Sequence, residues 1–427
     1  MSKPTEYAYM NTPSPMRVAV VGGMRTPFAR AGAALKKHPP LQLAVHSVNG
    51  LLQQQDLDPQ AVEQLVYGVV IVDPRIPHLA REVVFASALP AEVRALTVTD
   101  NCITGISAIT GVYDAIVGGR AQVGIAGGVE SMSNPALLFS KEAARLFLDA
   151  SLAKTAREKL RLFLQLRSRH FKPHPPAIVE PSTGLSMGEH TELMVKQWKI
   201  TRIEQDEIAL RSHRRAHAAT EDGRLRAEIR PLDGIDHDLL IRADTTLDKL
   251  SALPPVFDRS PSGTITAGNS SPLTDGAASV LLMSEARARS DGREPLAFVH
   301  GFEYVGIDPK DGLLMGPAVA VPRLLRRLGL TLADMDIVEM HEAFAGQVAC
   351  NLRAWEQGWK EAAIGSVDVE VLNPLGGSIA VGHPFAATGA RIVTTLAYEM
   401  QRRQARYGLI SICGAGATAS AMILQRD

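Results

Sequence analysis

Two cysteines and a histidine occupy predicted turns, where their side chains could carry out nucleophilic and acid–base chemistry. Cys102 follows a predicted strand and precedes a predicted helix over 103–117; N–H groups at a helix start favour an anion, hence a thiolate at neutral pH. His383 lies in a Gly-His-Pro turn before another predicted helix, and Cys413 ends an apolar run over 407–412. A histidine that takes the proton of a cysteine creates a strong nucleophile. Taken singly, such residues are more often an inert core thiol and a satisfied structural histidine.

A second polar pair, His341 and Glu342, follows the apolar run over 337–340. Polar groups at the end of a buried strand are candidates for a site, because loops held by a rigid scaffold carry function. The plainer interpretation is that Glu342 caps a helix. A Gly-Ala-Gly-Ala loop follows Cys413 and is small enough for a substrate to approach the backbone.

The elements that would position these residues alternate as in an α/β protein. Four segments predict parts of a core: strands over 17–21, 65–72 and 95–100, and a helix over 41–55. The first of these strands is expected to end in a turn at Gly22-Gly23. Segments 96–132 and 368–422 share the order strand, turn, helix, strand, Gly-rich loop, which indicates an internal duplication. Two similar halves would place their loops at one shared face.

A long polar segment, 136–250, interrupts this pattern and predicts an inserted loop domain that begins with a helical pattern over 141–166. Residues 141–172 hold nine Lys and Arg against three Asp and Glu, with apolar side chains on one helical face. A basic amphipathic hairpin of this kind could bind a membrane surface or a partner protein. The alternative is a solvated face that covers the core.

Charge and cysteine content exclude several classes of protein. Lys plus Arg and Asp plus Glu number 45 each in 427 residues, so no overall field attracts nucleic acid. Cys102, Cys350 and Cys413 are too few for a disulfide framework and lack the spacing of metal ligands, which favours a reducing, cytoplasmic setting and no metal site. Residues 1–16 lack the apolar run of a signal peptide and predict a frayed tail. The uncharged run over 407–424 is broken by glycines, so we expect two strands there and no membrane helix.

Seven stretches, in this order, resemble the motifs of the thiolases, and the likeness spans nearly the whole chain. They are Gly22-Gly-Met-Arg-Thr-Pro-Phe28, Asn101-Cys102, Gly127-Gly-Val-Glu-Ser-Met-Ser133, Thr266-Ala-Gly-Asn-Ser-Ser-Pro-Leu-Thr-Asp-Gly-Ala277, His341-Glu-Ala-Phe344, Asn373-Pro-Leu-Gly-Gly-Ser-Ile-Ala-Val-Gly-His-Pro384 and Cys413. His341, where many short-chain thiolases carry Asn, and the basic hairpin resemble the long-chain β subunit of fatty-acid oxidation complexes. Ala417 and Ala419 stand where the family usually has Gly, which leaves the shape of the last loop open.

The resemblance implies an α/β thiolase fold, in which two duplicated βαβαβαββ halves form five α-β-α-β-α layers. One half would comprise residues 16–135 with 251–290, and the other residues 291–427. Residues 136–250 would be the inserted loop domain. A homodimer or tetramer is expected.

The resemblance also implies the chemistry, which is cleavage of a 3-ketoacyl-CoA by coenzyme A in fatty-acid β-oxidation, by a ping-pong reaction through an acyl-cysteine. Cys102 would attack the keto carbon after His383 takes its proton. Cys413 would protonate the departing acetyl-CoA enolate and then deprotonate the incoming coenzyme A. One oxyanion would be held by His383 with a water on His341, and the other by the backbone N–H groups of Cys102 and Ala415.

Three further roles follow from the same likeness. Glu342 would orient the first oxyanion pocket, Ser271 would hydrogen-bond the pantetheine arm, and Met187 would line its tunnel. Coenzyme A is the co-substrate, and no tightly bound cofactor is implied. An α subunit with hydratase and hydroxyacyl-CoA dehydrogenase activities, or a peripheral membrane contact, would be the further partner.

Three other functions remain open alternatives. A short-chain acetoacetyl-CoA thiolase working in condensation shares the same residues. A ketosynthase relative is disfavoured because such enzymes lack the second cysteine, here Cys413. The alternative from another class is a non-catalytic scaffold subunit attached by its basic hairpin.

Overall fold

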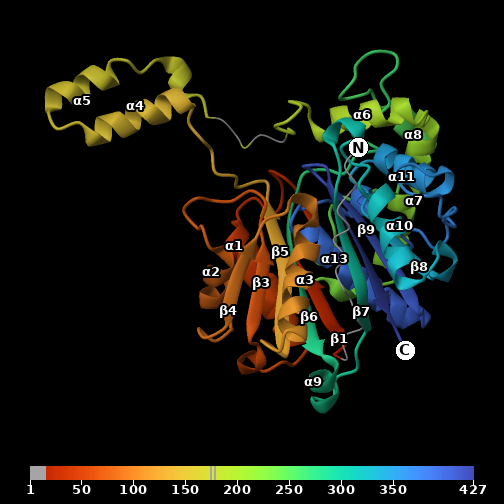
Figure 1. Cartoon of the computed structure of the whole chain (residues 1–427). Helices are drawn as coiled ribbons and strands as arrows, with labels where there is room; N and C mark the ends of the chain where they lie inside the picture. Colours follow the sequence, from red (N-terminus) through yellow and green to blue (C-terminus); the bar gives the residue numbers. More distant parts are fainter. Residues whose placement is uncertain (1–15, 174–175, 177–178) are drawn as a thin grey trace, which may run out of the picture.

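The computed structural model describes residues 16–173, 176 and 179–427, so the predicted tail lies outside the described residues except for Met16. Within the described part, ten strands form one sheet in the order β4-β3-β5-β6-β1-β7-β10-β9-β8, with the short β2 paired to β6 (Figure 1). The strands are β1 (Val18–Arg25), β2 (Ala29–Arg30), β3 (Gln64–Gly68), β4 (Arg94–Val98), β5 (Val123–Ser131), β6 (Thr274–Ser284), β7 (Ala297–Gly306), β8 (Ile337–Met340), β9 (Tyr407–Gly414) and β10 (Thr418–Gln425).

The sheet consists of two strand groups that meet at a short junction. Strand β3 is parallel to β4 and β5, and β6 lies antiparallel between β5 and β1. In the other group β10 is antiparallel to β7 and β9, and β8 is parallel to β9. Strands β1 and β7 join the groups through two residue pairs, Ala19 with Phe298 and Val20 with Ala297.

Helices separate and cover the two strand groups. The helices of the described residues are α1 (Pro40–Gln54), α2 (Leu79–Ala86), α3 (Thr104–Val117), α4 (Lys141–Leu152), α5 (Ala156–Phe163), α6 (Met187–Gln197), α7 (Arg202–Glu221), α8 (Leu247–Ser251), α9 (Glu285–Ser290), α10 (Pro317–Leu328), α11 (Ala345–Gln357), α12 (Ser378–Val381) and α13 (Ala387–Arg403), and all but α4 and α5 lie on the body. Helices α3 and α13 pack together, and α13 contacts strands of both groups, so their apolar cluster contains Val66 from β3 and Ile410 from β9. Helices α1 and α2 cover the outside of the first group, and α10 and α11 cover the second. This confirms the α-β-α-β-α layering.

The glycine pair of β1 lies inside the strand and does not form the predicted turn. Strand β1 continues through Gly22 and Gly23 to Arg25, and all of its residues are buried. A β-carbon on Gly23 would lie 2.1 Å from Oγ1 of Thr394 in α13, so glycine lets the central helix pack against the strand.

Two other predicted elements differ from the observed ones. The predicted strand over 65–72 ends at Gly68. The predicted strand at the start of 368–422 is reduced to an isolated bridge between Leu372 and Val338. Its residues turn instead, because the Asp368 carboxylate accepts a hydrogen bond from the N–H of Glu370 at 2.9 Å.

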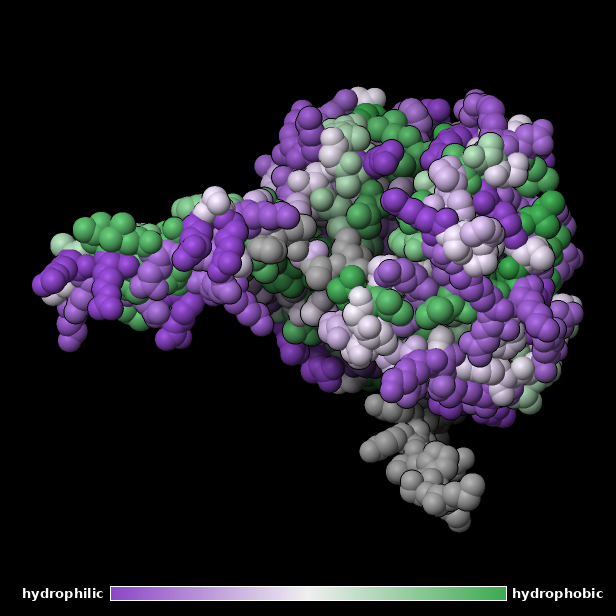
Figure 2. Space-filling model, turned by 90° about the horizontal axis from the view of Figure 1, so that it is seen from above, coloured by the Kyte–Doolittle hydropathy of each residue, from purple (hydrophilic) through white to green (hydrophobic). Residues whose placement is uncertain are grey.

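The segment 141–166, for which the sequence predicts a helical pattern, forms two helices, α4 and α5, that project from the body as an arm (Figure 1). A new helix starts after Thr155 because Thr155 and Glu158 form a capping box. None of the residues of α5 is buried, so the interpretation that this segment covers the core is wrong. Apolar residues gather along one side of the arm and polar residues along the other (Figure 2).

The rest of the insertion lies on the body, where α6 and α7 pack against α11 and α7 also packs against α12. Among the described residues, no helix is both long and apolar enough to cross a membrane. The described residues of segment 136–250 therefore form two parts, an arm away from the core and a layer of helices over the second strand group.

Candidate active site

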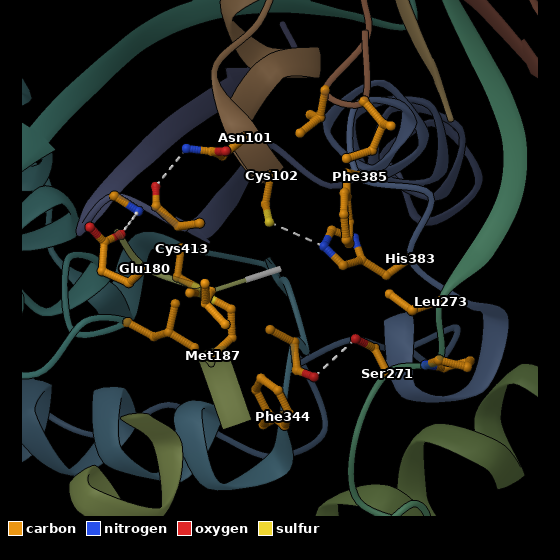
Figure 3. A pocket seen from close by; sticks show the side chains of 18 of the residues that line it. Asn101, Cys102, Glu180, Met187, Ser271, Leu273, Phe344, His383, Phe385 and Cys413 are labelled. Atoms are coloured by element: carbon orange, nitrogen blue, oxygen red, sulfur yellow. Dashed lines mark hydrogen bonds between the residues drawn. The ribbon is translucent and has the colours of Figure 1, made fainter. Parts of the chain in front are cut away.

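A largely apolar cavity of about 430 Å³ lies where the two strand groups and the insertion meet (Figure 3). Six of the residues singled out from the sequence line it, namely Cys102, Met187, Ser271, His383, Cys413 and Ala415. They come from turns far apart in the sequence, so the expectation of one shared face for the loops is met at this cavity.

Cys102 and His383 are in direct contact. Sγ of Cys102 lies 3.2 Å from Nε2 of His383 (Figure 3). Cys102 sits in a short 3₁₀ turn, Asn101–Ile103, directly before α3. The His383 backbone N–H donates to Oγ1 of Thr274 at 2.9 Å, and its Nδ1 lies 2.6 Å from Oγ1 of Thr388 in α13. The imidazole is thus fixed on two sides with Nε2 facing the sulfur.

Burial favours the neutral forms of this pair. It raises the pKa of the Cys102 thiol to about 11, although the N–H groups of Ala415 and of Cys102 itself pull the pKa down. Burial and the Arg391 charge lower the pKa of His383 to about 3. The expectation of a thiolate at neutral pH is therefore wrong, because removal of the sulfur from water outweighs the helix-start N–H groups. A neutral imidazole beside a thiol is still arranged as a general base.

Cys413 lies at the far end of β9 and is buried. Burial raises the pKa of its thiol well above the ordinary value, so it is protonated at neutral pH and can donate a proton. The Asn101 side chain donates to the Ala415 carbonyl at 2.9 Å, and the Glu180 carboxylate accepts from the N–H of Gly416 at 3.1 Å. These two contacts hold the loop after Cys413.

The last loop keeps its turn despite the alanines. Ala417 has φ of 56°, in the left-handed region that favours glycine, and its carbonyl accepts from the N–H of Ile307 at 2.9 Å. Ala419 continues into β10, where its methyl group faces Gly316; a β-carbon on Gly316 would lie 2.5 Å from it. A glycine on the neighbouring segment thus makes room for the extra methyl group.

His341 lies behind His383, with ring centroids 4.2 Å apart. Its side chain is fully buried, and its Nδ1 lies 2.9 Å from Oγ of Ser378. One ring nitrogen of each histidine and Sγ of Cys102 all lie within 4.8 Å of one another. Among the described residues, this is also the one group of at least three such side chains close enough together to hold a metal ion.

Glu342 is a buried anchor and not a cap of the helix that follows it. Its carboxylate accepts hydrogen bonds from Ser212 Oγ at 2.7 Å, Asn373 Nδ2 at 2.8 Å and the N–H of Ile379 at 3.2 Å. The last of these groups belongs to α12, whereas α11 begins without a side-chain cap. Glu342 therefore holds the segment that leads to His383, and the helix-cap interpretation is wrong for α11.

The two predicted coenzyme A contacts have different surroundings. Ser271 donates from both its backbone N–H and its hydroxyl to the Ala343 carbonyl, each at 2.9 Å, which leaves oxygen lone pairs free to accept from a ligand amide (Figure 3). Met187 is the first residue of α6 and lines the cavity together with Phe344.

Sequence reasoning missed two residues that shape the site. Thr388 holds the catalytic histidine candidate, and its position five residues after His383, at a helix start, is a signal that could have found it. Glu180 lies in an irregular segment with no pattern of its own, so nothing local connects it with Gly416.

Comparisons with known proteins agree with this geometry. Residues 18–286 match the model of the thiolase N-terminal domain, and residues 293–426 match the thiolase C-terminal domain. The 3-ketoacyl-CoA thiolase of Erwinia tasmaniensis is 43% identical over 424 residues, covering 96% of this chain and 97% of the relative. That of Klebsiella pneumoniae is 42% identical with the same coverage.

Solved structures give the same assignment. The acetyl-CoA acetyltransferase of Bacillus anthracis superposes with a TM-score of 0.83 at 31% identity, covering 96% of this chain and 98% of that one. Human mitochondrial 3-ketoacyl-CoA thiolase gives a TM-score of 0.83 at 30% identity with equal coverage. With both family domains matched across nearly its whole length, the chain belongs to the thiolase family.

Proposed function

We propose that this chain is a 3-ketoacyl-CoA thiolase, an acetyl-CoA C-acyltransferase that cleaves a 3-ketoacyl-CoA with coenzyme A in fatty-acid β-oxidation. The observation that carries the proposal is the 3.2 Å contact between Cys102 Sγ and His383 Nε2, in a largely apolar cavity that Cys413 also lines. Relatives named 3-ketoacyl-CoA thiolase, at 42–43% identity over almost the full length, support it.

In the first half-reaction His383 Nε2 takes the thiol proton as Cys102 attacks the keto carbon. The bond between the keto carbon and the α carbon then breaks, which leaves an acyl-cysteine and the enolate of acetyl-CoA. Cys413 gives its proton to the enolate carbon, and acetyl-CoA leaves. The raised pKa of the Cys413 thiol suits a proton donor, because the thiol is intact when the enolate forms.

In the second half-reaction coenzyme A gives its thiol proton to the Cys413 thiolate and attacks the acyl-cysteine carbonyl. The N–H groups of Cys102 and Ala415, which already act on the sulfur, are placed to stabilise the resulting oxyanion. The tetrahedral intermediate collapses to the shortened acyl-CoA. Cys102 leaves as a thiolate and regains its proton from His383.

The enolate oxygen of the first half-reaction also needs donors. Protonated His383 and the neighbouring His341 would supply them, and each such donor is typically worth about 3 kcal/mol. Glu342 acts at a distance by holding the segment before His383. Ser271 accepts from the pantetheine arm, and Met187 lines its path.

The test is thiolysis by the purified protein of acetoacetyl-CoA and of 3-ketohexadecanoyl-CoA, followed by the loss of ketoacyl-CoA absorbance on addition of coenzyme A. A strong preference for the long chain supports β-oxidation, and a preference for the short one supports the acetoacetyl-CoA thiolase alternative. Absence of cleavage with both substrates would contradict the proposal and favour a scaffold. Cys102→Ser serves as the control that should form no acyl-enzyme.

A homodimer through the free edge of β4 is the assembly we propose. Strand β4 ends the sheet with no partner on its outer side among the described residues, and Leu96 on it is 43% exposed. The opposite end differs, because the chain at Val371 and Asn373 hydrogen-bonds to Val338 of β8 and covers that edge. An uncovered edge with apolar side chains is a typical site for pairing with a second copy.

The arm, α4 and α5, is the part that would bind a membrane surface or a partner protein. Its exposed apolar side chains include Leu152, Leu160 and Leu164. Hydrophilic residues lie along the other side (Figure 2), and residues 141–172 hold nine Lys and Arg against three Asp and Glu. We propose an anionic membrane surface as its target, in a cytoplasmic enzyme that meets the membrane peripherally. An α subunit with hydratase and hydroxyacyl-CoA dehydrogenase activities is the other candidate partner.

A further inference from the structure

The side chains behind the two histidines of the site form separate hydrogen-bond chains. His383 contacts Thr388, and His341 contacts Ser378, which is also bound by Arg391. All five side chains are buried, so a polar group that lacks a partner within the protein is costly, and the arrangement that leaves fewest unpaired is favoured. The direction of each chain can therefore be worked out from its members.

The chain behind His383 leaves Nε2 without a proton. The Thr388 hydroxyl donates its one hydrogen to the Pro384 carbonyl, at 3.4 Å. Its oxygen therefore accepts from Nδ1–H of His383 at 2.6 Å. The Nε2 lone pair then faces Cys102 Sγ, as a general base requires.

The chain behind His341 runs in the opposite direction. Arg391 has only N–H donors, so its Nη2 donates to Ser378 Oγ at 2.8 Å. Among the residues that the structure describes, the other partner of this hydroxyl is His341 Nδ1 at 2.9 Å. If Nδ1 carried a proton, the Ser378 hydrogen and the Nε2 lone pair of His341 would both be buried without a partner among the described residues. If Nδ1 is bare, the Ser378 hydroxyl donates to it, and only the Nε2 hydrogen is left over.

The proton of neutral His341 then lies on Nε2, which has no hydrogen-bond partner among the described residues although it is buried. Burial, His383 and Arg391 all lower the pKa of His341, so the ring is neutral and the tautomer decides what it can do. One nitrogen of this ring lies within 4.8 Å of Cys102 Sγ. An unpartnered N–H on a ring so close to the reacting sulfur is a donor available for charge that appears only during the reaction.

We propose that Ser378, oriented by Arg391, is a positioning residue that keeps His341 in the Nε2–H tautomer and makes it a hydrogen-bond donor on the enolate side of the site. The two neighbouring imidazoles thus hold opposite tautomers, one a base toward Cys102 and the other a donor toward the oxyanion. The role of His341 as a donor toward the oxyanion rests on the proposed thiolase function, whereas the assignment of its tautomer does not.

The first test is spectroscopic and uses the full-length protein labelled with ¹⁵N-histidine. Two-bond ¹H–¹⁵N correlation spectra distinguish the two neutral tautomers, and His341→Asn identifies the His341 signals among those of the 12 histidines. We expect Nε2–H for His341 and Nδ1–H for His383. The Nδ1–H form for His341 in the unaltered protein would overturn the proposal, whether or not any variant folds.

The second test compares Ser378→Ala with Ser378→Thr, which keeps the hydroxyl, and with Ser420→Ala. The Ser420 hydroxyl is buried in β10 and has no partner among the described residues, so its loss is a matched control for a deleted core hydroxyl. For Ser378→Ala we expect a mixture of His341 tautomers and a fall in kcat of up to about 100-fold with little change in KM, the pattern of a lost transition-state donor. Ser378→Thr should recover most of the rate, and Ser420→Ala should keep it.

Two kinetic outcomes would overturn the proposal, namely an unchanged kcat in Ser378→Ala or an equal loss in Ser420→Ala. An unchanged His341 tautomer in Ser378→Ala would do the same. Failure of the unaltered enzyme to cleave any ketoacyl-CoA would instead contradict the proposed function, and the nitrogen shifts would still decide the tautomer.

Discussion

Nδ2 of Asn101 lies 2.9 Å from the carbonyl oxygen of Ala415, so the turn that carries Cys102 is tied directly to the loop that follows Cys413. This bond joins a segment of the first family domain to one of the second. It places the two thiols on one cavity, where one can be acylated while the other transfers protons.

Replacement of Cys413 by Ala should separate these two steps. Cys102 and His383 remain, so the enzyme should still be acylated, but turnover should fall about 10²- to 10⁴-fold because the enolate receives no proton. Mass spectrometry of the trapped acyl-enzyme and the thiolysis rate measure the two effects. Cys350→Ala is the matched control, because Cys350 is buried in α11 away from the cavity. An unchanged rate in Cys413→Ala would remove Cys413 from the reaction.

The reaction of Cys102 with iodoacetamide should increase steadily with pH. Its thiol has a pKa raised to about 11, so the thiolate fraction grows about tenfold for each pH unit below that value. The pKa of His383 is lowered to about 3, so no imidazolium forms between pH 5 and 9 to hold a thiolate. Peptide mapping of the alkylated protein isolates the Cys102 rate. A rate that levels off near neutral pH would indicate a thiolate–imidazolium pair instead.

Removal of three charges from the arm should weaken binding to anionic vesicles. Lys154, Arg157 and Arg161 changed together to Gln should reduce the partition coefficient about 100-fold at low salt, since each basic residue contributes about 1 kcal/mol near such a surface. Vesicle sedimentation at increasing salt measures this, because screening should abolish the difference.

The control for this experiment replaces three exposed basic residues of the body, Lys36, Arg75 and Arg120, by Gln. If both triple variants bind anionic vesicles equally well, the arm is a solvated surface and not a membrane-binding element. A different outcome is that the arm variant loses binding to a hydratase–dehydrogenase subunit and keeps its binding to vesicles. That result would favour the protein as the partner of the arm.

Leu96→Arg should yield monomers if β4 pairs with a second copy. A charged side chain at the centre of that edge would be buried in the dimer and opposed by its own symmetry mate. Light scattering coupled to size exclusion measures the mass. Val369→Arg, at an equally exposed position on the second family domain, should leave the assembly unchanged. A dimer that persists in Leu96→Arg would place the interface elsewhere.

The helices that follow the cysteine and the histidine could be predicted because their apolar spacing lies within short windows, whereas the strand expected before His383 is reduced to an isolated bridge. Cys102 and His383 both lie directly before the helices expected there. Their contact spans 281 positions and depends on how the two central helices pack, which no local pattern encodes. Motif order therefore located the residues, and the fold supplied the distance between them.

The wrong predictions share a cause, because each depended on surroundings that local sequence does not show. The thiolate expected for Cys102 ignored how far the cavity removes the sulfur from water. The helix cap expected of Glu342 ignored Ser212 and Asn373, which approach from other parts of the chain.

The position of β6 between β5 and β1 has a consequence for synthesis on the ribosome. The first strand of the chain is apolar and fully buried, yet its two neighbours, β6 and β7, begin only at Thr274 and Ala297. At about 5–20 residues per second, β1 emerges on the order of ten seconds or more before any partner strand exists. During translation, the apolar residues of β1 are therefore exposed and prone to aggregate. A chaperone that binds unfolded chains would protect the protein most at this stretch.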